Sequence, residues 1–137
     1  MKELTLAATV ENIPVVTEFV ENQLEALDCP MKVQMQISIA IDEIFSNIAH
    51  YAYAPDNGEA TVRLEIEKEP LSAVITFIDG GVPYDPLTAA DPDTTLSAEE
   101  RDLGGLGIFM VKKSMDEMTY RHENGKNILS IRKTWRS

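Results

Sequence analysis

Apolar residues recur along the chain with two different periods, and each change of period marks the start of a new predicted element. The first strand is predicted at residues 4–8, where apolar and polar residues alternate. Apolar residues then recur at helical spacing over residues 13–27, after Asn12, a favourable N-cap residue. Pro30 ends this helix. A second helix is predicted over residues 31–52 and is apolar around more than half its circumference, which indicates a central position.

Beyond residue 60 the apolar positions recur every second residue. Residues 62–67 alternate apolar and charged side chains, and residues 73–78 form a more continuous apolar run, so both segments are predicted as strands. A third helix is predicted from about residue 107 to 118, followed by a hairpin that turns at Asn124-Gly125. This order predicts an α+β fold, a two-layer sandwich with about three helices on one face of a mixed or antiparallel sheet.

The methionine and aromatic residues at helical spacing are expected in the core. Met31, Met35 and Met110 belong to this set. Cys29 is the only cysteine, so the chain has no intramolecular disulfide, and no cysteine–histidine cluster suggests zinc.

Length and charge narrow the class of protein. A chain of 137 residues, 44% of them hydrophobic, predicts a single folded domain over residues 1–137. The net charge of −11 argues against nucleic acid or an anionic membrane surface as the binding partner. No signal peptide and no apolar run long enough to span a bilayer is visible, so a cytoplasmic protein is expected.

Two polar residues of the second predicted helix point to chemistry. Glu43 and Asn47 are four residues apart and therefore share a helix face. Polar groups on a buried helix need a partner or a cavity. A carboxylate beside a carboxamide oxygen suits Mg²⁺, which keeps several waters, together with a general base. A polar stripe satisfied by solvent or by backbone groups is the alternative.

Two glycine-containing segments are further candidates. Asp79 follows the apolar strand directly, where its carboxylate could accept a hydrogen bond from a ligand amino group, and Gly81 would let a flat ring approach the backbone. The segment from Gly104 to Gly107 leads into the third predicted helix, whose free N–H groups would suit an anion such as phosphate. An ordinary turn and a flexible connector are the respective alternatives. The loop over residues 82–103 between the two segments is predicted to be a flexible lid.

Together and in this order, the three segments resemble the GHKL ATPase superfamily, and within it the compact anti-sigma-factor serine kinases of bacteria. The resemblance covers essentially the whole chain and implies the histidine-kinase-type ATPase fold. It is carried by Glu43…Asn47 with His50-Tyr51-Ala52-Tyr53 (the N-box), by Asp79-Gly80-Gly81-Val82-Pro83 (the first glycine box), by Gly105-Leu106-Gly107 with the helix that follows (the second glycine box), and by the closing hairpin around Gly125-Lys126-Asn127.

The resemblance assigns a role to each matching residue, with ATP and Mg²⁺ as the implied cofactors. Asn47 would bind Mg²⁺, and Glu43 would be the general base that accepts a proton from the attacking hydroxyl. Asp79 would accept a hydrogen bond from the amino group of adenine, and Gly81 would let the base sit close. Gly105 and Gly107 would donate backbone N–H groups to the phosphates.

Arg101 is the only basic residue between Asp79 and Gly107. It is predicted to reach the γ-phosphate or a partner from the lid. A surface ion pair with a neighbouring acidic residue is the alternative.

The implied function is a Mg-ATP-dependent protein serine kinase. It would phosphorylate a small anti-anti-sigma protein and bind a sigma factor, and a homodimer is expected. The alternative is a nucleotide-gated binding switch of the same fold without catalysis, and the presence of Glu43 favours the enzyme. The ATPase portion of a sensor histidine kinase is disfavoured, because no dimerisation helix pair with a phospho-acceptor histidine precedes the N-box.

Overall fold

The computed structural model of the chain describes residues 1–53, 56–68, 70–88 and 103–135. Short 3₁₀ turns lie at Val10–Asn12 and Pro86–Thr88, and a π-helical turn lies at Ile48–Ala52. The main elements in chain order are β1 (Lys2–Ala7), α1 (Ile13–Glu25), α2 (Met31–Asn47), β2 (Glu59–Glu67), β3 (Ser72–Asp79), α3 (Leu103–Ser114), β4 (Glu117–Glu123) and β5 (Lys126–Thr134).

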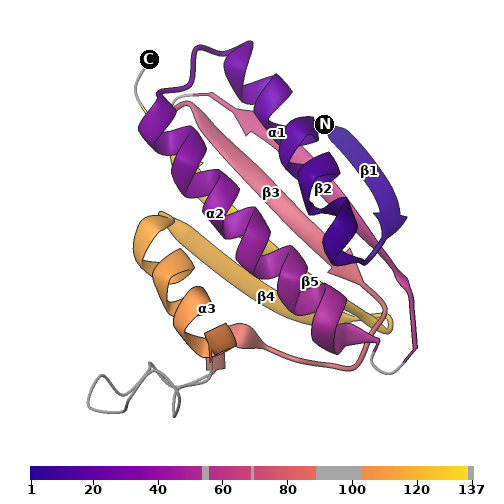
Figure 1. The fold of residues 1–137 in the computed structure, drawn as a ribbon. Helices are drawn as coiled ribbons and strands as arrows, with labels where there is room; N and C mark the ends of the chain where they lie inside the picture. The colour runs from indigo at the N-terminus through magenta and orange to yellow at the C-terminus, as the bar shows by residue number, and fades with distance from the viewer. Residues whose placement is uncertain (54–55, 69, 89–102, 136–137) are drawn as a thin grey trace.

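The described strands form one five-stranded sheet in the order β1-β2-β3-β5-β4, and every pairing between them is antiparallel. Figure 1 shows α1, α2 and α3 on the same face of this sheet, with α2 between the other two. The predicted α+β sandwich is therefore confirmed, and its sheet is antiparallel. Among the described residues, no helix is long and apolar enough to cross a membrane.

The core lies between the helices and the sheet. Alternate residues of β2, β3 and β5 point toward the helices, as their period of two predicts. The inner sides of α1, α2 and α3 complete this core. The largest fully buried side chains are Val16, Val20, Leu24, Ile37, Ile41, Ile44, Phe45, Val62, Leu64, Ile75, Phe77 and Ile131.

The core prediction is wrong for three methionines. Met31, Met35 and Met110 are 67%, 58% and 55% exposed. The described structure has only two layers, so the side of α2 turned away from the sheet faces solvent whatever residues it carries. Met31 and Met35 lie on this outer side of α2 and are exposed in the part of the chain that the structure describes.

The bounds of α2 and α3 differ from the prediction. The α-helical part of α2 ends at Asn47, and the π-helical turn Ile48–Ala52 follows it. The third helix, α3, begins at Leu103 and ends at Ser114, so both of its ends lie four residues before the predicted ones. Residues 117 and 118 belong to β4 instead. The buried α3 residues Ile108 and Val111 belong to the hydrophobic core, and this packing outweighs the cost of about 1 kcal/mol that each glycine brings to a helix.

Two predicted turn residues have different outcomes. Asn124 and Gly125 both have positive φ, 52° and 76°, as the predicted type of hairpin turn requires. Asn12 is at the N-cap position of α1, but its side chain makes no capping bond. Its Nδ2 donates instead to the carbonyl of Ala7, at 2.8 Å, and so ties the end of β1 to the start of α1.

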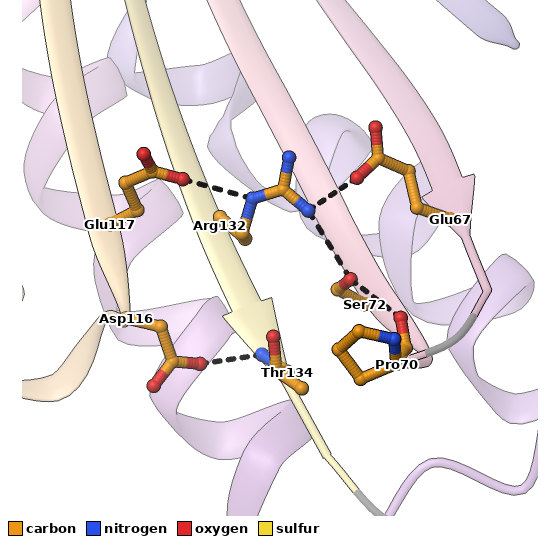
Figure 2. A network of polar contacts seen from close by, with 7 residues as sticks. All are labelled: Glu67, Pro70, Ser72, Asp116, Glu117, Arg132 and Thr134. Carbon is orange, nitrogen blue, oxygen red and sulfur yellow. Dashed lines mark hydrogen bonds and ion pairs between the residues drawn. The ribbon is translucent and has the colours of Figure 1, made fainter.

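The opposite face of the sheet carries a polar network centred on Arg132 (Figure 2). Its Nε donates a hydrogen bond to Glu117 on β4 at 3.0 Å. Its Nη1 donates to the carboxylate of Glu67 on β2 and to the hydroxyl of Ser72 on β3. These charge-assisted bonds raise the pKa of Arg132 further, with the bond to Glu67 as the largest cause. One side chain thus links four neighbouring strands at one end of the sheet.

Candidate nucleotide site

A pocket opens between the helices and the sheet, where α2, β3 and β5 meet. Its walls are mainly apolar, with a few polar groups, which is the usual composition of a small-molecule site. The lining residues are Ile44, Asn47, Ile48, Tyr51, Ala52, Phe77, Asp79, Val82, Tyr84, Pro86, Ile108, Tyr120, Asn127 and Leu129. Two of the predicted site residues, Asn47 and Asp79, therefore face the same pocket from opposite layers.

Glu43 lies one helical turn before Asn47, at the contact between α2 and α3. It is half-buried, and it does not line the pocket. A Cβ atom on Gly107 would overlap the carboxylate of Glu43. The absence of a side chain at position 107 therefore allows α3 to approach this carboxylate closely.

Burial raises the pKa of the Glu43 carboxyl, and the neighbouring charge of Asp42 raises it further. A carboxylate with a raised pKa is a stronger base than an exposed one, so it accepts a proton from a hydroxyl more readily. The environment of Glu43 therefore fits the role of a general base.

The π-helical turn after Asn47 shapes the other side of the pocket. Such turns are rare and are frequently found at functional sites. The carbonyl of Ala52, at the end of this turn, accepts a hydrogen bond from the N–H of Val82 at 2.9 Å. A Cβ atom on Gly81 would overlap that carbonyl. Gly81 therefore lets the segment after β3 close against the end of α2.

Asp79 is the buried carboxylate of the pocket, with 6% of its surface exposed. Its Oδ1 accepts two hydrogen bonds, from the N–H of Gly81 at 2.9 Å and from Nδ2 of Asn127 at 3.0 Å. Among the described residues, no hydrogen bond reaches Oδ2. This arrangement fixes the carboxylate in one orientation and leaves one oxygen to accept a hydrogen bond from a ligand.

Asn127 is the site residue for which the sequence analysis assigned no separate role. It is 6% exposed and lies opposite Asp79 in the β3–β5 pairing. Its Nδ2 also donates to the carbonyl of Val82 at 2.8 Å, and its Oδ1 accepts from the N–H of Tyr84 at 3.2 Å and from the hydroxyl of Tyr120. Every hydrogen-bonding group of the carboxamide is therefore used.

The alternation of inward-facing and outward-facing residues along β5 could have identified Asn127 from the sequence. Positions 127, 129 and 131 all point into the core, where Leu129 and Ile131 are apolar and Asn127 is not. A polar residue at a core position of a strand indicates a specific partner. Naming that partner as Asp79 requires the register between β3 and β5, which the sequence pattern alone does not provide.

Two tyrosines hold the surroundings of Asp79. The hydroxyl of Tyr53 accepts a hydrogen bond from the N–H of Gly80 at 2.7 Å and donates to the carbonyl of Glu59 at 2.6 Å. Burial, followed by the charges of Asp85 and Asp79, raises the pKa of Tyr120, which keeps its hydroxyl protonated as the donor to Asn127. The turn after β3 is thus held from both sides.

The remaining predicted site residues belong to the segment before and within α3. Gly105 lies in the first turn of this helix, where backbone N–H groups have no acceptor within the helix. Gly107 is two residues further along, and the carboxylate of Glu43 occupies the space that a side chain at position 107 would need. Arg101 and residues 89–102 of the predicted lid lie outside the described residues, so the structure gives no position for them.

The structure is thus a two-layer α+β fold with a mainly apolar pocket between its layers. The pocket contains the buried, hydrogen-bonded carboxylate of Asp79, and Glu43 and Asn47 lie one turn apart on the central helix. Comparison of sequences identifies the family: the chain belongs to the histidine kinase-like ATPase domain family, which matches residues 6–133. The GHKL resemblance of the three motifs is thereby confirmed.

Several curated proteins are similar to this chain, and their names are those of protein kinases. The serine/threonine-protein kinase BtrW of Bordetella bronchiseptica is 24% identical over 100 residues, which are 73% of this chain and 70% of that protein. The serine-protein kinase RsbW of Bacillus cereus and that of Bacillus mycoides are each 28% identical over 97 residues, or 68% of this chain. The chain spans 59% of the length of these two RsbW proteins.

Proposed function

We propose that this chain is a Mg-ATP-dependent protein serine kinase that also acts as an anti-sigma factor. It would transfer the γ-phosphoryl group of ATP to a serine of a small anti-anti-sigma protein, and it would bind a sigma factor as a cytoplasmic homodimer. The observation that carries the ATP-binding part is the pocket in which Asp79 and Asn47 face each other from the two layers. The family and the kinase names of the relatives support the choice of reaction.

Adenine recognition would depend on Asp79. Its Oδ1 is occupied by Gly81 and Asn127, so Oδ2 is the oxygen that would accept a hydrogen bond from the adenine amino group. Guanine presents a carbonyl oxygen at the corresponding ring position, and a carboxylate cannot donate a hydrogen bond to it. The pocket would therefore prefer ATP to GTP.

Asn47 would contribute an oxygen ligand to Mg²⁺. This ion takes few protein ligands beside substrate phosphates, so one carboxamide oxygen together with phosphate oxygens and water is a suitable set. The described residues contain no cluster of three or more histidine, cysteine, aspartate or glutamate side chains that would suit a metal ion better. The bound ion would neutralise charge on the phosphates.

Glu43 would accept the proton of the serine hydroxyl. The serine oxygen forms a bond to the γ-phosphorus, the bond from that phosphorus to the oxygen of the leaving ADP breaks, and the proton moves to the Glu43 carboxylate. The raised pKa of Glu43 favours this transfer. Gly105, in the first turn of α3, would direct its N–H at the phosphates, and Arg101 would act from the lid.

A second candidate function rests on the position of Glu43. This side chain stands between α2 and α3 and does not line the pocket, so a nucleotide could bind without contacting it. In that case the chain would be a nucleotide-gated switch that holds a regulator and transfers no phosphate. Catalysis therefore needs its own test.

The test measures transfer of ³²P from γ-labelled Mg-ATP to the small anti-anti-sigma proteins of the same organism. We expect labelled phosphoserine with the wild-type chain. With Glu43→Gln we expect a loss of at least about 100-fold in rate, because a positioned general base contributes about 10²–10⁴-fold. ATP binding by Glu43→Gln serves as the control and should be retained. ATP binding without transfer to any of these proteins would favour the switch.

A further inference from the structure

The outer side of α2 carries an exposed apolar stripe. Met31, Met35 and Ile39 are 67%, 58% and 54% exposed. They are spaced four residues apart, which places them along one side of the helix over about 12 Å. Single exposed apolar residues are ordinary, but an aligned set rimmed by polar residues marks an interaction site.

The stripe borders a groove between α1 and α2. The groove has a volume of about 310 Å³ and is lined by Glu21 and Glu25 of α1 and by Met31, Gln34, Met35, Ser38 and Ile39 of α2. Ser38 donates a hydrogen bond to Glu21 at 2.8 Å, which fixes one carboxylate at the groove wall. An apolar stripe beside a groove is the shape that accepts an amphipathic helix, and methionine adapts to the side chains of a partner.

The segment that contains α1 and α2 is acidic. Residues 10–47, which include α1 and α2, hold seven acidic side chains and one basic side chain, Lys32. That segment alone accounts for a net −6 of the total −11. Within the described part of the chain, neither Glu21 nor Glu25 forms an ion pair. The groove therefore presents carboxylates that no cation of the described chain neutralises.

We infer that the α1–α2 groove binds a basic amphipathic helix of a partner protein. The apolar side of that helix packs on Met31, Met35 and Ile39, and its lysine or arginine side chains pair with Glu21 and Glu25. Complementary charge increases the association rate and excludes acidic partners. A stripe of about 12 Å matches about two turns of a docked helix.

A second copy of this chain is the wrong occupant on electrostatic grounds. A two-fold symmetric contact pairs the same patch on both subunits. It would bring the glutamates of one groove close to the identical glutamates of the other, with no cation of the described groove to separate them. Like charges at an interface oppose association.

This docking surface is separate from the nucleotide pocket. Of the seven residues that line the groove, none lines the pocket described above. The inference therefore does not depend on the proposed kinase activity. If the kinase proposal fails, the inference about the groove still stands, and the reverse is also true. The variant Asp79→Asn should therefore bind the partner helix as the wild type does.

The experiment uses the full chain and a synthetic probe. The probe is a peptide of about 18 residues made of leucine and lysine, with leucine at the i, i+3, i+4 and i+7 positions so that it forms an amphipathic helix. A control peptide has the same composition in an order that gives no apolar helix side. Binding is followed by the NMR signals of ¹³C-labelled methionine methyl groups and by fluorescence anisotropy.

We expect the helical peptide to shift the methyl signals of Met31 and Met35 and to leave Met110 unchanged. Met110 is similarly exposed, at 55%, but lies on α3. Met35→Gln/Ile39→Gln should weaken binding by about ten-fold or more, because two apolar contacts are lost. Met110→Gln is its matched control and should have no effect.

The charge contribution is tested separately. Glu21→Gln/Glu25→Gln should weaken binding and reduce its dependence on salt, because the screened attraction is removed. Glu59→Gln/Glu65→Gln removes the same number of charges from exposed positions on β2 and should change affinity by less than about two-fold.

Four results would overturn the inference. These are absence of methyl shifts at Met31 and Met35, equal binding of the control peptide, and unchanged affinity of Met35→Gln/Ile39→Gln. The fourth is a dimer of the wild-type chain in sedimentation that this double variant abolishes, since the stripe would then contact a second copy.

Discussion

Replacing Asn127 by alanine should remove the discrimination of the pocket for the adenine amino group. Asn127 donates to Asp79 at 3.0 Å, and this bond together with the one from Gly81 fixes the carboxylate. A hydrogen bond to a charged group contributes about 1.5–3 kcal/mol, which corresponds to about 10–100-fold in affinity. If Asp79 accepts a bond of this kind from adenine, the wild-type chain should prefer ATP by that factor over purine riboside triphosphate, which lacks the amino group.

In Asn127→Ala, Asp79 keeps one of its two hydrogen bonds and can rotate away. We expect the preference for ATP over the analogue to fall below about five-fold, mainly through weaker ATP binding. The variant also loses the bonds to Val82, Tyr84 and Tyr120, so its free energy of unfolding should fall by about 2–4 kcal/mol. Isothermal titration calorimetry with both nucleotides and urea unfolding measure these two effects.

A matched control separates specificity from stability. Ser130 lies on the other side of β5 and shares one hydrogen bond of 2.9 Å with Thr76. Ser130→Ala should cost about 1 kcal/mol of stability and keep the full preference for ATP. If folded Asn127→Ala binds both nucleotides more weakly by the same factor, Asn127 acts only on stability and does not contribute to the selection of adenine.

Three further predictions concern Glu43, Gly107 and Cys29. The raised pKa of Glu43 stabilises the folded state below about pH 4.5, and this contribution is lost as the pH rises through the raised pKa. At about pH 7 the buried carboxylate is ionised, so Glu43→Gln should increase the unfolding temperature more at about pH 7 than at about pH 4. An equal increase at both pH values would contradict this prediction. Gly107→Ala would overlap the Glu43 carboxylate and should lower the unfolding temperature, whereas Gly107→Ala in the Glu43→Ala background should be tolerated. Burial raises the pKa of Cys29 to about 11, so its thiol should resist alkylation at about pH 8 until the chain is unfolded in urea, and rapid labelling of the native protein would refute this.

The candidate site residues that the sequence singled out belong to local motifs. Glu43 and Asn47 are one helical turn apart, and Asp79 ends an apolar strand, so spacing along one element was enough to single them out. The meeting of Asn47 and Asp79 in one pocket followed from the family resemblance, because it depends on how α2 packs on the sheet.

The features that the sequence analysis missed depend on contacts between distant elements. The role of Asn127 follows from the register of β3 against β5, which brings it opposite Asp79. The early start of α3 follows from its packing on the core, which offsets three glycines. The exposure of Met31 and Met35 follows from the absence of a third layer over α2 in the described structure, and periodicity alone does not report the number of layers.

ATP binding by the pocket beside Asp79 can be tested with a single substitution, Asp79→Asn. The substitution preserves size but replaces one carboxylate oxygen with a donor, so the hydrogen bonds around position 79 and to the adenine amino group cannot all be made. Calorimetry in the presence of Mg²⁺ should show ATP binding to the wild-type chain and a loss of at least about ten-fold in the variant. Equal ATP affinity in the two proteins would contradict the account.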